Sequence, residues 1–143
     1  MNHEYMTGGF STIYILRNRV RSWDEVSFTI QAGGCHAPCH PQAPTFQFVE
    51  QNVRIFVPGK EDLYRRLSVR ECARVQTFPD NFKFYYKNIA DGYKMIGNAV
   101  PIRMATILAK KIIADLSAVE TVQIPTIKRW ETGSNMIEHS VAI

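Results

Sequence analysis

The stretch from Arg65 to Phe82 constrains the fold of this chain more than any other part of it. Its sequence is Arg-Arg-Leu-Ser-Val-Arg-Glu-Cys-Ala-Arg-Val-Gln-Thr-Phe-Pro-Asp-Asn-Phe. Ser68 and Glu71 have the spacing of a capping box, in which the hydroxyl accepts from the third helical N–H and the carboxylate accepts from the N–H of the cap residue. Pro79 cannot continue a helix. The sequence therefore predicts a short capped helix between Ser68 and Pro79.

The side chains of this helix divide into two faces, because residues three and four positions apart are neighbours on a helix. Arg70 and Arg74 share one face. The other face is mostly apolar and is formed by Val69, Cys72, Ala73 and Gln76.

A second constraining stretch runs from Asp91 to Pro101 and leads into a long helix. Gly97-Asn-Ala-Val-Pro101 predicts a tight turn, with the proline at the first helical position, where its missing N–H has no cost. The helix is expected over Pro101–Leu116. Its apolar stripe consists of Ile102, Ala105, Ala109, Ile112, Ile113 and Leu116, and it is widened by Met104, Ile107 and Leu108. A stripe of this width indicates burial on more than one side.

The first 60 residues have the composition of short strands, rich in β-branched and aromatic residues between turn signals. The expected strands are Ser11–Leu16, Val26–Gln31, Phe46–Val49 and Val53–Val57, the last two joined by a turn at Gln51-Asn52. The predicted fold class is therefore α+β. It combines a small, irregular, mostly antiparallel β lobe, a short capped helix and a long C-terminal helix.

Three arginines follow the first expected strand at alternate positions, Arg17, Arg19 and Arg21. If the strand continues, all three point to one face, about 6.6 Å apart. That spacing is close to two nucleotide steps of about 3.4 Å each, and arginine is the side chain that best reads guanine in the major groove. The alternative is an ordinary solvated face.

Cys35-His-Ala-Pro-Cys-His40 places two cysteines and two histidines within six residues and raises the alternative of a structural metal site. The ligands would be Cys35, His36, Cys39 and His40. Adjacent Cys and His side chains cannot easily point the same way, and the chain holds no second Cys/His pair. We therefore predict no metal.

Composition limits the protein class. The 143 residues have a net charge of +4 and a pI near 9.1, which permits binding to a polyanion without requiring it. Three cysteines, an odd number, argue against a disulfide framework. The chain has neither a signal peptide nor an apolar run of about 18 residues. We expect a soluble, cytoplasmic protein with reduced thiols and no membrane contact.

The two constraining stretches resemble the last two sequence blocks of DNA (cytosine-5) methyltransferases. Four sequence motifs upstream resemble the target-recognition segment of those bacterial restriction-modification enzymes of this family that read a GGCC-type site. These motifs are Ser11-Thr-Ile-Tyr14, Arg17-Asn-Arg-Val-Arg-Ser-Trp23, Phe28-Thr-Ile-Gln31 and His40-Pro-Gln-Ala-Pro44. The resemblance covers roughly residues 2 to 116. One departure is Cys35, which occupies a place where the family often has arginine, so the exact DNA site stays open.

The resemblance implies three parts and two kinds of site. Residues 1–90 would be a partial target-recognition domain with the penultimate motif, 91–116 the final motif turn and helix, and 117–143 a C-terminal extension. The turn would line the S-adenosylmethionine pocket with Gly97, Asn98, Ala99 and Val100. DNA would be contacted by Arg17, Arg19, Arg21, Gln31 and Arg70.

The family's reaction needs a flipped cytosine, an attacking cysteine thiolate and a methyl donor. This sequence lacks the motifs that carry out the reaction in the family. They are a Gly-rich cofactor turn, Pro-Cys-Gln, Glu-Asn-Val and Gln-x-Arg. We therefore expect no catalytic residue and no methylation by this chain alone. It would be the small subunit of a split methyltransferase or a truncated remnant. It would pair with a catalytic subunit, or self-associate, through the Pro101–Leu116 helix. The alternative is a DNA-binding module without chemistry.

Overall fold

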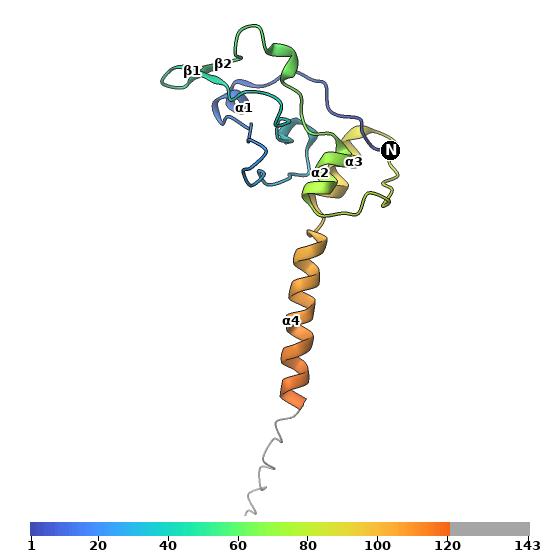
Figure 1. Ribbon diagram of the computed structural model, residues 1–143. Coiled ribbons are helices and arrows are strands. Elements are labelled where there is room, and N and C mark those ends of the chain that lie inside the picture. The colour runs from blue at the N-terminus through green and yellow to red at the C-terminus, as the bar shows by residue number, and fades with distance from the viewer. Residues whose placement is uncertain (121–143) are drawn as a thin grey trace, which may run out of the picture. The chain divides into compact units, whose positions relative to one another are not determined.

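The computed structural model describes residues 1–120, and the chain divides into two units, Met1–Ala109 and Lys110–Ile143. The first unit contains α1, a two-stranded sheet, α2 and α3, and α4 begins within it (Figure 1). Single 3-10 turns form at Gly34–His36 and Glu61–Leu63. Most of the C-terminal extension expected over residues 117–143 lies outside the described residues.

The capped helix is α2, Val69–Val75, and its capping box is confirmed. Ser68 Oγ accepts from the Glu71 N–H at 3.2 Å, and Glu71 Oε2 accepts from the Ser68 N–H at 2.8 Å. Val69, Cys72 and Ala73 are completely buried, as the apolar face predicts. The cap fixes where the chain enters the helix, and this places the buried face against the rest of the unit.

Two expected strands are absent from the described structure. Residues Ser11–Leu16 form a helix instead, α1 (Thr12–Leu16), because Ser11 caps it by accepting from the Tyr14 N–H at 3.2 Å. Residues Val26–Gln31 have no regular secondary structure. Strand-forming residues need a partner strand and a face to pack on, and the structure supplies neither at these places.

The expected hairpin is confirmed. Strands β1 (Gln47–Glu50) and β2 (Val53–Ile55) pair antiparallel, with Gln47 opposite Ile55, and the register shifts by one residue before the turn. Asn52 in the turn has a φ of +63°, a conformation that asparagine tolerates better than most residues. The fold is therefore α+β over the described residues, with a smaller sheet than the sequence indicates.

A helix that the sequence analysis did not predict, α3 (Ile89–Gly97), packs beside α2. Asn88 caps it by accepting from the Asp91 N–H at 3.0 Å. Tyr93 and Ile96 are completely buried, and the Tyr93 hydroxyl donates to the Leu67 carbonyl at 2.6 Å. One apolar core thus joins α2 and α3 to residues of the irregular chain before α2 and between the two helices. Its buried members are Ile30, Ala37, Leu67, Val69, Cys72, Ala73, Phe84, Tyr93 and Ile96.

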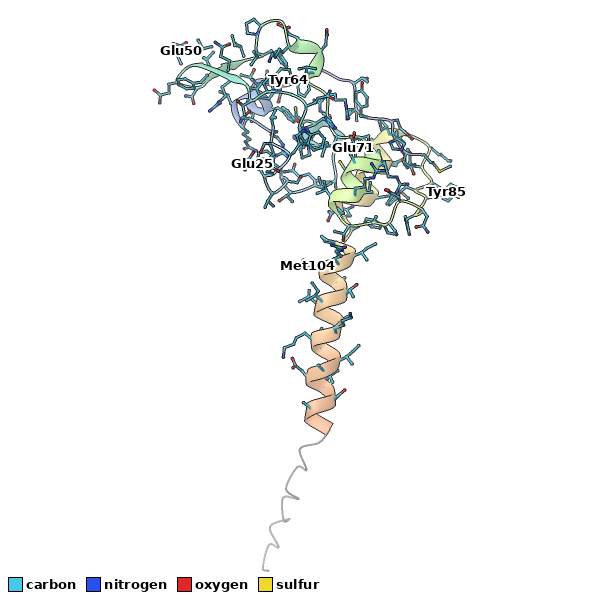
Figure 2. All side chains as sticks on the ribbon, in the orientation of Figure 1. Glu25, Glu50, Tyr64, Glu71, Tyr85 and Met104 are labelled. Atoms are coloured by element: carbon cyan, nitrogen blue, oxygen red, sulfur yellow. The ribbon has the colours of Figure 1, made fainter. Side chains whose placement is uncertain are left out.

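A second core holds α1 against the hairpin and is mainly aromatic. Tyr64 stacks on Phe46 with ring centroids 4.7 Å apart, and Phe56 meets Tyr64 edge-on at 4.9 Å. Figure 2 shows Tyr64 in this crowded region, whereas Tyr85, on the loop between α2 and α3, points outward and is 72% exposed. Residues 11–44, the predicted target-recognition segment and called the recognition segment below, contribute side chains to both cores.

The long helix is confirmed as α4, Ile102–Glu120, which starts directly after Pro101. Its large apolar side chains are exposed: Ile102, Met104, Ile107, Leu108, Ile112, Ile113 and Leu116. Among residues 1–120, no helix combines the length and the apolar content that a membrane crossing requires.

Candidate nucleic-acid interface

The three alternating arginines do not share one face, because residues 17–21 form no strand. Arg17 is the C-terminal cap of α1, and its side chain is exposed. Arg21 is also exposed. Its guanidinium pairs with Glu25 at 3.2 Å and lies 4.2 Å from the centroid of the Phe28 ring. Both side chains lie at the surface of the recognition segment, where a ligand could reach them.

Arg19 differs from its neighbours because its side chain is only 9% exposed. Its guanidinium carbon lies 5.1 Å from the Phe28 ring and 5.9 Å from the Tyr14 ring. The Nε and Nη2 atoms are buried and have no hydrogen-bond partner among residues 1–120. The aromatic faces offset part of the cost of burying this cation, but two strong donors remain without acceptors.

Arg70 is not placed to contact DNA, in contrast to the sequence prediction. It is 2% exposed, and its Nη2 donates to Asn2 Oδ1 at 3.1 Å and to the Phe82 carbonyl at 2.6 Å. Longer contacts reach the carbonyls of Met1 and Pro79. The N-terminal segment therefore covers this face of α2, and Arg70 holds that segment in place. Arg74, on the same face, is exposed and pairs with Asp80 at 2.7 Å.

Gln31, the remaining predicted DNA contact, lies within the recognition segment, and its side chain is exposed. Its backbone meets the predicted cofactor turn. A Cβ atom built on Gly97 would lie 2.5 Å from the Cα atom of Ala32, and still closer to Ala32 N and to the carbonyl carbon of Gln31. Only glycine fits this approach. The structure therefore brings the DNA-reading and cofactor candidates into direct contact through their backbones.

The turn that follows Gly97 presents two exposed side chains, Asn98 and Val100. The N–H groups of Asn98 and Ala99 are engaged by the Lys94 and Ile96 carbonyls, both at 3.1 Å. The side-chain amide of Asn98 makes no hydrogen bond within the part of the chain that the structure describes. One free amide beside one apolar side chain suits a wall of a nucleoside pocket, and a complete pocket would need further residues.

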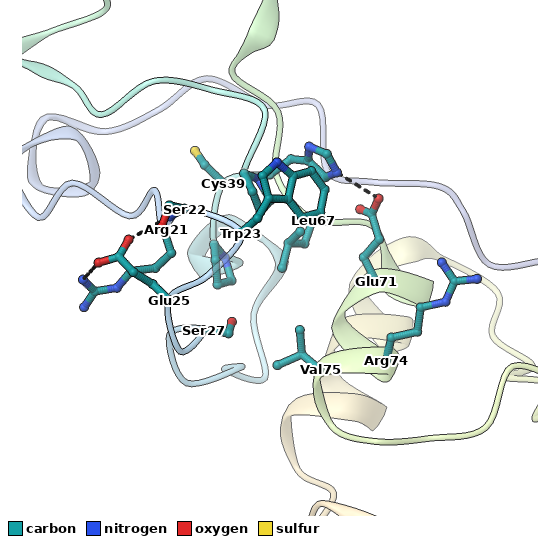
Figure 3. A pocket seen from close by; sticks show the side chains of 13 residues that line it. Arg21, Ser22, Trp23, Glu25, Ser27, Cys39, Leu67, Glu71, Arg74 and Val75 are labelled. Carbon is teal, nitrogen blue, oxygen red and sulfur yellow. Dashed lines mark hydrogen bonds and ion pairs between the residues drawn. The ribbon is translucent and has the colours of Figure 1, made fainter.

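An open pocket of about 330 Å³ lies between the recognition segment and α2. Figure 3 shows Arg21 and Glu25 on one side of it, and Glu71 and Arg74, from α2, on the other. Trp23 is 71% exposed and touches His40 edge-on, with ring centroids 5.2 Å apart. The sequence analysis did not single out Trp23, although an exposed tryptophan beside arginines is a signal for base stacking.

An ion-pair network behind this pocket ties the recognition segment to α2. Arg65 makes two 2.8 Å bonds to the Glu71 carboxylate, and His40 Nε2 lies 3.6 Å from it. Burial raises the pKa of Glu71, but the bonds from Arg65 and Ser68 outweigh burial and bring it to about 2. Burial and Arg65 lower the pKa of His40, against the opposing effect of Glu71. The network therefore contains an ionised carboxylate at neutral pH.

The metal alternative lacks a ligand set. Cys39 is buried, and its sulfur lies 3.3 Å from the Tyr14 hydroxyl; burial also raises the pKa of its thiol. His40 faces Glu71, whereas Cys35 and His36 are exposed on the preceding turn. Within residues 1–120, no group of three or more His, Cys, Asp or Glu side chains is arranged to hold a metal ion.

Comparison with known proteins bears on the whole arrangement. Residues 1–114 match the C-5 cytosine-specific DNA methylase family. The type II methyltransferase M.MthTI of Methanothermobacter thermautotrophicus is 68% identical over 118 residues, which are 82% of this chain and 36% of that protein. M.FnuDI of Fusobacterium nucleatum is 57% identical over 122 residues (85% and 36%), and M.NgoPII of Neisseria gonorrhoeae is 56% identical over 111 residues (78% and 33%).

The match runs through the recognition segment, α2 and α3 and into α4, so it includes every element that carries a candidate residue. The chain spans only about a third of the length of these curated relatives. With its matched region covering most of its own length, the chain belongs to the C-5 cytosine-specific DNA methylase family.

Proposed function

We propose that this chain is the target-recognition and final-motif part of a type II DNA (cytosine-5) methyltransferase. It binds DNA and completes the S-adenosylmethionine pocket, but it transfers no methyl group by itself. The proposal rests on the match of this chain to about a third of each methyltransferase. Its sequence also lacks the family's Pro-Cys-Gln motif and Gly-rich cofactor motif. The remainder of the machinery is then supplied by a complementary catalytic part.

DNA binding is assigned to the recognition segment. Arg17 and Arg21 are exposed there, whereas Arg19, the third predicted contact, is buried, so Arg17 and Arg21 carry the proposal. Guanine O6 and N7 are acceptors that match a guanidinium, which is consistent with a GC-rich target of the GGCC type. Arg70 is excluded from this role because its donors are engaged within the chain. Gln31 is kept as a DNA contact because its side chain is exposed.

The cofactor is assigned to the turn Gly97–Val100, which supplies one wall. Asn98 offers a free amide and Val100 an apolar contact 59% exposed, which fits the polar and apolar parts of a nucleoside. S-adenosylmethionine supplies the methyl group when bound. The other walls and the attacking thiol belong to the complementary part, which we place against the exposed apolar side chains of α4.

The test pairs this chain with the part of M.MthTI that the match does not cover, about two thirds of that protein; M.MthTI is the relative with 68% identity. The two parts are co-expressed, and plasmid DNA is digested with a restriction enzyme that cuts GGCC only when it is unmethylated. Protection that requires both parts supports the proposal. Methylation by this chain alone, or none with the partner present, contradicts it.

A binding assay tests the recognition segment separately. Arg17→Ala is expected to weaken binding to a GGCC duplex by about 1–3 kcal/mol if its guanidinium reads guanine. Arg103→Ala, on α4, removes the same charge outside the recognition segment and serves as the matched control. Equal losses in the two variants would mean that Arg17 contributes only general charge.

The missing catalytic motifs also permit an alternative, a non-catalytic DNA-binding module. Such a module would bind DNA in a salt-sensitive way, yet no partner would convert that binding into methylation.

A further inference from the structure

Gly97 and the recognition segment approach each other backbone to backbone. The overlap that a Cβ would create at Gly97 is with backbone atoms of Gln31 and Ala32, not with the flexible end of a side chain. Backbone atoms cannot swing away, so neither segment can move independently here. Glycine at position 97 is therefore required by the approach itself, without any reference to a ligand.

The opposite side of the turn is held by Gln76, the C-terminal cap of α2. Its side-chain Nε2 donates to the Ile96 carbonyl at 3.4 Å, and its own carbonyl accepts from the Ile102 N–H at 3.2 Å. The side chain is 8% exposed. One residue thus holds the chain immediately before and immediately after the turn. The adjacent Thr77 Oγ1 accepts from the Arg103 N–H at 2.9 Å.

The turn that begins at Gly97 is therefore contacted from two sides. Gln76 fixes both of its ends, and the Gln31–Ala32 backbone presses on Gly97. What remains free is the outer side with Asn98 and Val100, which are exposed. The Gln31–Ala32 backbone thus touches the turn that carries these two side chains, so a displacement of that backbone would act on the turn directly.

We propose that Gly97 and Gln76 are positioning residues that couple the recognition segment to the methyl-donor turn, so that DNA held by the segment changes the affinity for the donor. This rests on the proposed function. Coupling of this kind is reciprocal, because each ligand changes the affinity for the other by the same factor. The donor is then held best when the recognition segment is occupied.

The first test uses the chain alone and needs no activity. Amide hydrogen exchange is measured at Asn98 and Ala99 in Ala32→Gly, which loosens the backbone that supports Gly97. Coupling predicts exchange faster by about fivefold, the lower end of typical coupling factors. Val26→Gly loosens an exposed position in the same segment, without contact to the turn, and is the control. Unchanged exchange in Ala32→Gly, or equal acceleration in both variants, overturns the proposal.

The second test uses the chain joined to its complementary part. Gln76→Met keeps the side-chain length but removes the donor to Ile96. We expect the KM for S-adenosylmethionine to rise about fivefold while kcat changes less than about twofold. A merely structural role would lower the amount of folded enzyme, and hence the apparent kcat, and would leave KM unchanged.

Gly97→Ala and Gly33→Ala form a matched pair in the same assembled protein. A Cβ at Gly33 would make only an ordinary 3.5 Å contact with the His36 ring, so Gly33→Ala should behave as wild type. Gly97→Ala should weaken both donor and DNA binding, although it adds one methyl group outside the recognition segment. Loss of only one of the two affinities contradicts the coupling. If the wild-type assembly does not methylate DNA, the proposed function fails, whereas the exchange experiment still decides the coupling.

Discussion

Arg66 offers the sharpest test of what holds the recognition segment together. Its side chain is 2% exposed, and no carboxylate pairs with it among the described residues. Its guanidinium instead donates to four carbonyl oxygens, those of Cys35 at 3.3 Å, Met6 at 3.4 Å, Gly8 at 2.5 Å and Gly9 at 2.8 Å. The guanidinium carbon also lies 4.3 Å from the centroid of the Phe10 ring. One side chain therefore ties three separate segments together.

The perturbation is Arg66→Met, which keeps most of the side-chain volume and removes all donors. Two short bonds, to Gly8 and Gly9, dominate, and a hydrogen bond to a charged group contributes about 1.5–3 kcal/mol. The two short bonds together therefore predict a loss of about 3–6 kcal/mol in the free energy of unfolding. Arg66→Lys keeps the positive charge but not the planar guanidinium with its several donors, so its free energy of unfolding should fall by less than that of Arg66→Met.

The assay is urea unfolding followed by circular dichroism, with the midpoint and slope compared among variants. Arg17→Met is the matched control, because Arg17 is exposed and its replacement should change the free energy of unfolding by less than about 0.5 kcal/mol. If Arg66→Met is too unstable to fold, Arg66→Lys still reports the loss. A change below about 1 kcal/mol in Arg66→Met would refute the argument that its carbonyl bonds organise the segment.

Three further changes test the helices and their network. Ser68→Ala should cost about 1 kcal/mol through the lost cap of α2, measured by the same urea assay. Tyr93→Phe leaves the Leu67 carbonyl and the Met6 N–H without a partner and should cost about 1–3 kcal/mol; a neutral result would mean that water replaces the hydroxyl. Since the pKa of Glu71 is lowered from 4.5 to about 2, its ionised form stabilises the fold above pH 4.5, and that contribution is lost as the pH falls toward 2. Glu71→Gln should flatten the dependence of the urea midpoint on pH within this window.

The sequence predicted the elements whose signals are local. The capping box of α2 is written in two residues, the hairpin turn in Gln51-Asn52, and α4 in a long 3.6-residue period, and all three are confirmed. The helix α3 also had a local signal, the cap formed by Asn88 and Asp91. Gly92 inside this segment weakens its helical signal, because glycine has a low helix propensity.

The sequence failed where long-range contacts decide the outcome. Ser11–Leu16 has strand composition, yet a serine cap and the burial of Tyr14 among aromatic rings make it helical. Arg70 lies off the apolar face of α2, which predicts exposure, but the N-terminal segment covers it from 68 positions away. Helical periodicity tells which residues share a face, and it cannot tell which distant segment will pack on that face.

Two of the buried arginines, Arg66 and Arg70, bind the N-terminal segment to the rest of the first unit. The first ten residues form no helix or strand, and Arg66 and Arg70 bind their carbonyl groups across nearly the whole first unit. Asn2 completes the link, because its side chain donates to the Phe84 carbonyl at 2.9 Å and accepts from Arg70. The Val69 and Arg70 N–H groups, which a helix leaves unpaired at its start, donate to Glu4 and Asn2. Polar links of this kind need no neighbouring sheet, so they fix the N-terminal segment against α2 with groups that the first unit itself supplies.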